Sequence, residues 1–308
     1  MSDWPELLPW EPTRATLHRW TQVVGKVRLA LTPWTNHSWH VPLYVTPRGL
    51  TTGPVPHGAR LFQIDLDLSD HGVVISTDTE VQRLALRPQS VAAFTREVLG
   101  ALDGLGVGVE IHGAPNEVED AVPFLEDRDH ASYDRAAVER FAASLRQAHR
   151  VLTAFRAPFV GKVSPVHFFW GSFDLAVTRF SGRAAPPLES SLPNLPGWIN
   201  REAYTHEVSS VGLWLGDADH APFFYSYAYP QPDGFAGAEV QPDAAHYDPD
   251  FGEFVLPYAA IAAASDPDGT LLAFCTSTYA AARRGVPAWD GLEAEAPEPA
   301  RPRQLRPR

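Results

Sequence analysis

The segment Gly161–Arg183, GKVSPVHFFWGSFDLAVTRFSGR, places charged side chains among five aromatic residues. Lysine and arginine bind carboxylate and phosphate groups, and aromatic rings beside them can hold the apolar part of the same ligand. We therefore expect Lys162, Arg179 and Arg183 to form a positive pocket for an anionic, partly apolar small molecule, with Trp170 as a wall. The alternative is a set of internal ion pairs that join two parts of the structure.

A weaker copy of this segment lies at Gly25–Gly49, GKVRLALTPWTNHSWHVPLYVTPRG. Both copies begin with Gly-Lys-Val, contain tryptophan and lead to a strand with Val-Thr. The correspondence predicts an internal duplication whose copies meet near a pseudo-twofold axis and share one cleft. Trp39, His40 and Arg48 of the first copy are then further candidates for ligand binding.

Lysine is rare in this chain. Only two of the 25 Lys and Arg residues are lysines, Lys26 and Lys162, and each lies in one of the Gly-Lys-Val tripeptides. Lysine offers a compact ammonium group where arginine offers a planar, forked guanidinium. The pattern indicates that these two positions need an ammonium group. A lysine that binds a ligand and a lysine that forms a buried ion pair would both meet this need for an ammonium group.

Asp174 lies among apolar residues of the second copy. An unpaired carboxylate in apolar surroundings is costly, and a cationic partner offsets part of that cost. We expect this partner to be Lys162, Arg179 or Arg183.

Histidines are the candidate proton-transfer residues. The catalytic candidates are His167, in the second copy, and His206, which precedes Glu207. Neighbouring residues of a strand point to opposite faces, so only one of His206 and Glu207 can reach a ligand. His37 and His40 are three residues apart and, with the two catalytic candidates, could bind a metal ion. Because histidines beside tryptophans more often pack as amphipathic side chains, the metal and any cofactor stay unassigned.

Signatures of well-known active sites are absent from the sequence. A P-loop needs a glycine five residues before its Gly-Lys and a Ser or Thr after it. Trp20 and Val27 hold these places in the first copy, and Arg156 and Val163 hold them in the second. The chain also lacks G-x-S-x-G, C-x-x-C, H-E-x-x-H and G-x-G-x-x-G, so hydrolase, zinc-finger and dinucleotide-binding functions are unsupported.

Composition limits the partners and the location of the protein. A net charge of −12 and an isoelectric point near 5.4 oppose binding to nucleic acid or to an anionic membrane. No apolar run approaches the roughly 20 residues of a membrane-spanning helix. Cys275 is the one cysteine, so no intramolecular disulfide can form, and the N-terminal residues lack the pattern of a secretory signal. We expect a cytoplasmic protein.

Apolar periodicity predicts the elements that carry these residues. Helices are expected to begin at Thr13, Ser90 and Asp134, the first ending at Gly25, and to cover residues 257–264 and 268–284. Strands are expected at residues 41–46, 60–68, 73–77, 81–86, 206–215, 223–229 and 253–256. Each half therefore consists of a helix, an antiparallel sheet and a closing helix, which predicts an α+β fold made of two such units about a pseudo-twofold axis.

The expected domains follow the duplication. Residues 1–125 form the first repeat and residues 126–290 the second, packed together as one globular body, with an acidic, solvated connector at 114–130. The Pro-rich loop 184–200 is long enough to act as a lid or a binding loop. The Arg/Pro-rich tail, 291–308, is expected to be disordered.

Three motifs connect the chain to a known family. The chain resembles the uncharacterised bacterial domain-of-unknown-function 5996 family in three stretches. They read VGKVRLALTPWTNHSWHVPLYVTPRGLTT, FVGKVSPVHFFWGSFDLAVTRFSGR and YSYAYPQP. The resemblance covers nearly the whole chain, to about Asp290. It implies a bacterial, cytoplasmic protein, and it brings no activity, cofactor or catalytic residue.

These residues together predict a pocket for an anionic small molecule between the two halves, in a protein that is an enzyme or a binder. The candidate ligand-binding residues are Lys26, Trp39, His40, Arg48, Lys162, Trp170, Asp174, Arg179 and Arg183, and the catalytic candidates are His167 and His206. The alternatives are a ligand sensor without catalysis and a protein-interaction module that uses the tryptophan-bearing N-terminal arm, the Pro-rich loops and the tail.

Overall fold

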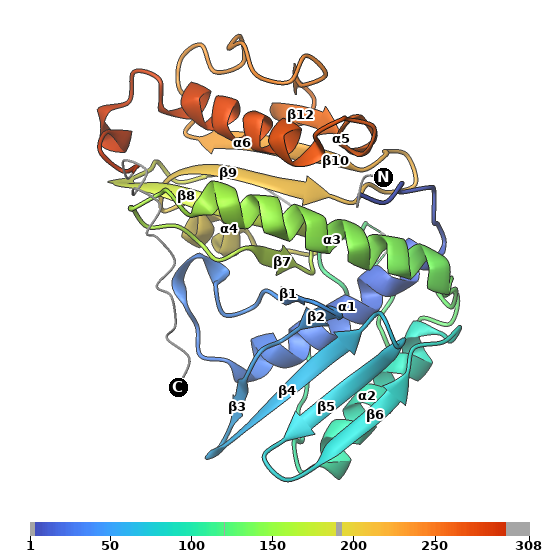
Figure 1. Ribbon diagram of the computed structural model, residues 1–308. Coiled ribbons are helices and arrows are strands. Elements are labelled where there is room, and N and C mark those ends of the chain that lie inside the picture. Colours follow the sequence, from blue (N-terminus) through green and yellow to red (C-terminus); the bar gives the residue numbers. More distant parts are fainter. Residues whose placement is uncertain (1–3, 120, 189–192, 294–308) are drawn as a thin grey trace, which may run out of the picture.

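Two antiparallel sheets and the helices that cover them form the structure (Figure 1). The computed structural model describes residues 4–119, 121–188 and 193–293. These residues form six α-helices and two six-stranded sheets, so the expected α+β class is confirmed. No helix among them has the length and apolar character needed to cross a membrane.

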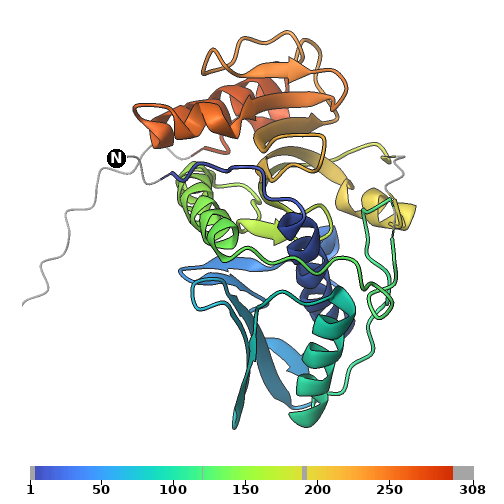
Figure 2. The same ribbon diagram turned by 90° about the vertical axis from the view of Figure 1, so that its right-hand side faces the viewer.

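The first sheet contains the strands of the N-terminal half. Its order is β1 (Tyr44–Thr46), β2 (Gly49–Thr51), β4 (Arg60–Asp67), β5 (Gly72–Thr77) and β6 (Val81–Ala85), with β3 (Val55–His57) beside β4. Phe62, Ile64 and Leu66 of β4 are buried, and the residues between them are partly exposed, as the alternation predicts. Helices α1 (Thr13–Leu31) and α2 (Val91–Gly104) cover the buried face (Figure 2).

The second sheet contains the strands of the C-terminal half. Its order is β11 (His246–Asp248), β12 (Glu253–Pro257), β10 (Phe223–Tyr229), β9 (His206–Trp214), β8 (Asp174–Ala184) and β7 (His167–Phe169). Helices α3 (Arg135–Arg156) and α6 (Pro267–Arg283) lie against one face, and the short α5 (Tyr258–Ala262) follows β12 (Figure 1). The other face is turned toward α1 and α4 (Gly197–Ala203). Because both faces are covered, β8 and β9 are buried along most of their length.

Side-chain caps mark the start of two predicted helices. The Ser90 hydroxyl accepts a hydrogen bond from the Ala93 amide, and the Asp134 carboxylate accepts one from the Ala137 amide. Each cap satisfies a backbone N–H group that has no partner inside the helix. Helices α2 and α3 therefore begin where the sequence predicts.

Helix α1 does not end at Gly25, as expected, but continues to Leu31. Gly25 lies inside the helix because Trp170 covers it: an added Cβ would lie 2.2–2.5 Å from atoms of the indole ring. Glycine is a poor helix former, and the contact of a large ring with the exposed helix backbone offsets this disadvantage.

The two Gly-Lys-Val segments lie in different local structures. The first is part of α1, and the second, residues 161–163, is irregular chain between α3 and β7 with a single bridge from Val163 to Arg179. The two copies nevertheless meet, because the backbone of Leu43 pairs with that of Phe168 in antiparallel orientation. The tripeptides do not occupy equivalent elements, and the duplication stays a prediction.

One hydrophobic core joins the two expected halves. The Trp20 ring of α1 stacks on Phe94 of α2 at 4.7 Å and on Tyr133, just before α3, at 5.5 Å. Trp10 of the N-terminal arm stacks on Phe141 of α3 at 5.2 Å. Aromatic contacts therefore cross the expected boundary at residue 125, and the division into two repeats stays a prediction.

Substitution of Gly25 by alanine should destabilise the protein. The added methyl group would overlap the Trp170 indole, and overpacking of a core costs about 1–3 kcal/mol. Gly100 is the matched control, because it lies inside α2 with nothing within 4 Å of an added Cβ. Alanine at Gly100 should stabilise the protein by about 0.5–1 kcal/mol through helix propensity. Urea unfolding of G25A and G100A checks both, and a G25A protein as stable as the wild type would contradict the prediction.

Candidate ligand-binding cavity

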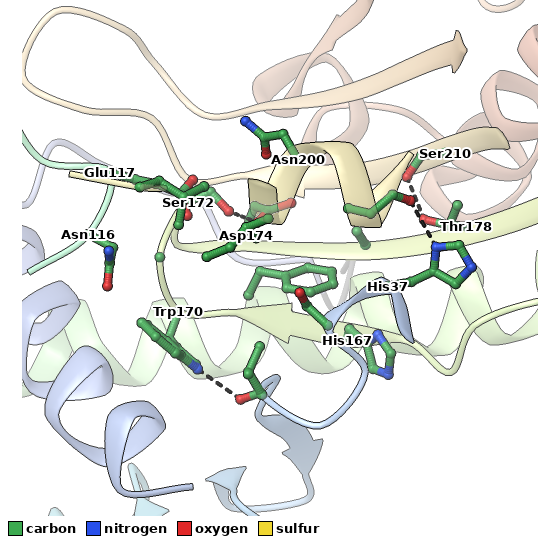
Figure 3. A pocket seen from close by; sticks show the side chains of 18 of the residues that line it. His37, Asn116, Glu117, His167, Trp170, Ser172, Asp174, Thr178, Asn200 and Ser210 are labelled. Carbon is green, nitrogen blue, oxygen red and sulfur yellow. Dashed lines mark hydrogen bonds between the residues drawn. The ribbon is translucent and has the colours of Figure 1, made fainter. Parts of the chain in front are cut away.

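A cavity of about 770 Å³ lies between the second sheet and α1 (Figure 3). Its walls are strands β7 to β10 and β12, the second half of α1, the 3-10 turn Asn36–Ser38, α4 and the segments 112–117 and 194–196. The last segment belongs to the loop 184–200, expected to form a lid or to bind ligand, of which residues 189–192 lie outside the described chain. Residues far apart in the sequence therefore surround one space.

Alternation along β8 decides which of its side chains reach the cavity. Every second residue lines it: Asp174, Ala176, Thr178 and Phe180. The strand register then aligns these residues with those of β9. The Thr178 hydroxyl lies 2.9 Å from the hydroxyl of Ser210, its direct partner. One face of the sheet thus supplies a continuous polar and aromatic wall.

Hydroxyl groups hold the carboxylate of Asp174. Ser172 donates to one carboxylate oxygen and Tyr225 of β10 donates to the other. Tyr225 reaches Asp174 across β9 because its direct partner on that strand is Gly212, where an added Cβ would lie 2.5 Å from the phenol. Burial raises the pKa of Asp174, and the two hydroxyl donors oppose that rise.

Two further carboxyl groups line the cavity, those of Glu117 and Glu253. Burial, together with the charge of Asp174, raises the pKa of Glu117 to about 7 and the pKa of Glu253 to about 8. Burial lowers the pKa of Lys26 to about 8, and the charge of Glu117 opposes this change. The Lys26 ammonium donates to the side-chain oxygen of Asn116. Three carboxyl groups and one ammonium group therefore interact within this lining.

His37 and His167 line the cavity at a distance from Glu117 and Asp174 (Figure 3). His167 of β7 is 1% exposed, and burial with nearby arginine charges lowers its pKa to about 3. Burial also lowers the pKa of His37. The Lys162 ammonium lies just behind this part of the wall, 5.1 Å from the ring centre of Trp39 and 4.8 Å from that of Phe180. Because their pKa values are lowered, the imidazoles of His37 and His167 are uncharged at neutral pH.

Several buried polar atoms of the lining have no hydrogen-bond partner within the described residues. They are Nδ1 and Nε2 of His167, Nε2 of His37 and Nδ2 of Asn200. None of the three side chains is more than 7% exposed. A buried polar group without a partner costs about 1–3 kcal/mol, so each such group needs an explanation. A ligand with complementary atoms would provide one.

Strained backbone gathers at the same cavity. Across the described ranges, six non-glycine residues have a positive φ of 53–58°. Four of the six line the cavity: His37, Ser38, Glu117 and Asn194. A fifth, Phe173, directly precedes Asp174. This conformation costs about 1–3 kcal/mol per residue and concentrates at functional sites, so the strain favours a binding role for the cavity.

The structure brings five of the predicted site residues to the cavity lining: Lys26, Trp39, His167, Trp170 and Asp174. Three more lie next to lining residues. Lys162 contacts Trp39, the His206 ring lies 5.7 Å from that of His37, and the His40 ring lies 4.3 Å from that of Trp34. The described residues contain no group of three or more His, Cys, Asp or Glu side chains that could hold a metal ion.

Two of the predicted arginines are paired at the surface. Arg48 forms ion pairs with Asp67 and Asp70 at the edge of the first sheet. Arg183 forms an ion pair with Glu207, on the far part of β8 and β9. Neither arginine lines the cavity.

Arg179 is buried on the opposite face of β8 from the cavity. Its guanidinium lies 3.7 Å from the ring centre of Phe155 and 4.3 Å from that of Tyr279, and it is 3.5 Å from Glu293. Asp174 and Arg179 are five residues apart on one strand, so their side chains point to opposite faces. The expected ion pair between Asp174 and a lysine or arginine of its segment is therefore wrong, and hydroxyl groups take that place.

The lining also contains residues that sequence reasoning missed. Tyr225 and Tyr227 alternate in YSYAY, a pattern that could have placed both on one face of a strand. Glu117 falls in the stretch expected to be a solvated connector, yet its carboxylate packs on Gly171, where an added Cβ would lie 2.2 Å away. No local pattern marks Glu253, which follows a turn-rich loop.

The fold and the cavity define an α+β protein whose second sheet bears an aromatic and carboxyl-lined pocket on one face. The chain belongs to the family described as a family of unknown function, DUF5996, whose family model matches residues 4–296. This match spans nearly the whole chain and confirms the resemblance seen in the two Gly-Lys-Val segments. No curated protein and no solved structure matches the chain significantly.

The pH dependence of stability should reveal the carboxyl groups of the cavity. The pKa of Glu253 rises from 4.5 to about 8 on folding. Between these pH values the Glu253 carboxyl group is therefore ionised in the unfolded chain and protonated in the folded chain. The folded state therefore loses stability as pH rises through this window, by up to about 1.4 kcal/mol per pH unit. Glutamine cannot ionise, so E253Q should gain stability relative to the wild type as pH rises.

Urea unfolding between pH 5 and pH 8 measures this difference. E239Q is the control, since Glu239 is exposed on the loop before β11. A difference between E253Q and the wild type that stays constant across the range would contradict the prediction.

Proposed function

We propose that this protein binds a small organic molecule in the cavity beside the second sheet. The observation that carries the proposal is the imidazole of His167, which lines the cavity, is 1% exposed and has no hydrogen-bond partner within the described residues. Its ring is surrounded by those of Trp39, Tyr44 and Phe169. A phenylalanine would make the same ring contacts without two unpaired nitrogens. A ligand that bonds to the imidazole supplies a reason for histidine here.

The cavity has the size of a metabolite pocket. Its volume of about 770 Å³ lies within the range of about 300–1,000 Å³ that is usual for small-ligand sites. Much of its lining is aromatic: Trp34, Trp39, Phe169, Trp170, Phe180, Tyr204, Trp214, Phe223, Tyr225, Tyr227 and Phe251. These walls support a ligand with a sizeable apolar body, which the polar groups of the lining would orient.

An anionic ligand, as expected from the sequence, would depend on Lys26. Of the described residues that line the cavity, Lys26 is the one lysine or arginine. Lys162 lies behind the wall, against Trp39. The three arginines expected to reinforce a positive pocket are Arg48, Arg179 and Arg183, and all have partners elsewhere. An anion therefore has a single cation to bind at this lining.

Binding is better supported than acid–base catalysis by histidine. A general base works best when its pKa lies near the operating pH. The pKa of His167 is lowered to about 3, which makes its imidazole a weak base. If the bound molecule is also converted, Glu117 and Glu253, with pKa values of about 7 and 8, are better suited to transfer protons.

The reciprocal placement of the two lysines supports the proposed duplication. The Lys26 ammonium lies 5.5 Å from the ring centre of Trp170, in the second copy, and the Lys162 ammonium lies 5.1 Å from that of Trp39, in the first. Exchange of equivalent contacts between two copies is what a pseudo-twofold axis produces. We propose that such an axis relates the two segments.

The interaction-module alternative and the cellular location stay predictions. The module would use the N-terminal arm, the Pro-rich loops and the tail 291–308, and residues 294–308 of the tail lie outside the described chain. The bacterial and cytoplasmic assignments rest on composition and on the resemblance to the family.

Replacement of His167 by phenylalanine should separate stability from binding. The variant keeps the ring contacts and removes two unpaired nitrogens, so the unligated protein should be as stable as the wild type or more stable, by about 1–3 kcal/mol. His18→Phe is the matched control. The pKa of buried His18 is also lowered to about 3, but its Nε2 lies 2.8 Å from the Gly171 carbonyl, so its loss should destabilise the protein.

Urea unfolding and native mass spectrometry of freshly purified protein test the proposal. A small molecule bound to the wild type and missing from H167F is the expected result. The proposed function is wrong if the wild type carries no molecule and H167F loses as much stability as H18F.

A further inference from the structure

We infer that the molecule bound in the cavity carries a positively charged amine, held where Glu117, Asp174 and Glu253 line the wall. The inference rests on the proposed function and names its class of ligand. Three carboxyl groups converge there from three separate parts of the chain, namely the segment 112–117, β8 and β12. This convergence makes the lining suited to a cation.

Acidic groups outnumber basic groups in this lining. Among the described residues, three carboxyl groups and one ammonium group line the cavity, and the ammonium of Lys26 already donates to Asn116. The charges that act on Glu253 are those of Asp174 and Asp248, which are both negative. Like charges in a partly buried site repel each other. A ligand ammonium beside Glu253 would replace this repulsion by attraction.

Aromatic rings stand beside the carboxyl groups. The strand register places Trp214 of β9 opposite Asp174, and Phe223 of β10 opposite Trp214. Phe251 completes the group, with its ring centre 6.1 Å from that of Trp214 and 5.3 Å from that of Phe223. Ring faces attract organic cations, and aromatic cages are a common way to bind amines. An anion would gain nothing comparable from these faces.

Asn200 of α4 gives an independent sign of a ligand. Its side chain lines the cavity and is 7% exposed, and its Nδ2 has no hydrogen-bond partner within the described part of the chain. Figure 3 shows Asn200 on the Asp174 side of the cavity. An amide donor here would bind an oxygen of the same molecule. The best-fitting ligand is therefore an amine with an apolar body and a hydroxyl or carbonyl group.

The pH dependence of binding should distinguish an amine from an acid. The titratable groups of this part of the lining are Lys26, His112, Glu117, Asp174, Tyr204, Tyr225, Tyr227 and Glu253. Burial raises the pKa of all three tyrosines, which stay uncharged. With pKa values of about 7 for Glu117 and 8 for Glu253, the carboxylates form as pH rises, so amine affinity should rise. An acid would need protonated Lys26, whose pKa is about 8, and its affinity should fall above that pH.

Matched probes that differ only in charge test the inference. The first set is 2-phenylethylamine, 2-phenylethanol and phenylacetate, and the second is tryptamine, tryptophol and indole-3-acetate. Tryptophan fluorescence for the phenyl set, and isothermal titration calorimetry for both sets, measure binding to the full chain between pH 6 and pH 8. At pH 8 each amine should bind about ten-fold more tightly than the acid with the same body. Its affinity should also rise several-fold across this pH range.

Variants of the lining locate the binding. Glu253→Gln keeps the shape of the side chain and removes its charge, so amine affinity should fall about ten-fold and lose much of its rise with pH, while alcohol affinity changes little. Glu239→Gln, exposed on the loop before β11, should bind like the wild type. Leu29→Trp, at a half-buried position of α1 that lines the cavity, should weaken all probes by filling space.

The outcomes separate this inference from the proposed function. An acid that binds at least as tightly as its amine, or an amine affinity that E253Q leaves unchanged, overturns the amine inference and leaves the binding function intact. Binding that L29W does not weaken places the probe elsewhere and overturns both. The amine inference and the proposed function are also both overturned if no probe binds and the purified protein carries no bound molecule.

Discussion

The contact between Trp170 and Gly25 sets the distance between the two halves of the protein. The indole lies directly on the backbone of α1, and its Nε1 donates to the Val41 carbonyl at 2.8 Å. Protein interiors are close-packed, so a larger residue at position 25 would move the helix away from the second sheet. That movement would shift Lys26 relative to Asp174 and widen the cavity. The site therefore depends on a helix–tryptophan contact, although much of its polar lining comes from loops.

The central strand β8 serves the core with one face and the cavity with the other. Asp174 and Thr178 face the cavity, where hydroxyl partners hold them. Arg179 faces α3 and α6, where its guanidinium stacks on Phe155 and Tyr279 and donates to the Phe155 carbonyl. The second face secures the sheet against its helices by apolar and cation–π contacts. The segments that surround the cavity on the first face can then hold strained backbone and unpaired polar atoms without loss of the fold.

Local signals made most of the fold predictable, and the site was predictable only in part. Caps such as Ser90 and alternation such as that of β4 act over a few residues, so sequence pattern reveals them. The continuation of α1 past Gly25 depends on Trp170, far along the chain, and no local pattern contains that contact. The expected positive pocket failed for a simpler reason. The cations of this segment do not share one face of β8, because the two-residue period of a strand turns Arg179 away from Asp174.

The space around the two ammonium groups accounts for lysine at positions 26 and 162. Each lies over a tryptophan of the other segment, Lys26 at 5.5 Å from Trp170 and Lys162 at 5.1 Å from Trp39. An ammonium group has three donors and is compact, so one ring face and few acceptors satisfy it, whereas a guanidinium presents five donors in a plane. Arg179 shows the contrast, because it occupies a wide aromatic layer on the other face of the sheet. Beside the cavity, lysine supplies positive charge with fewer unpaired donors than arginine would leave, and this explains why the chain keeps lysine at these two places.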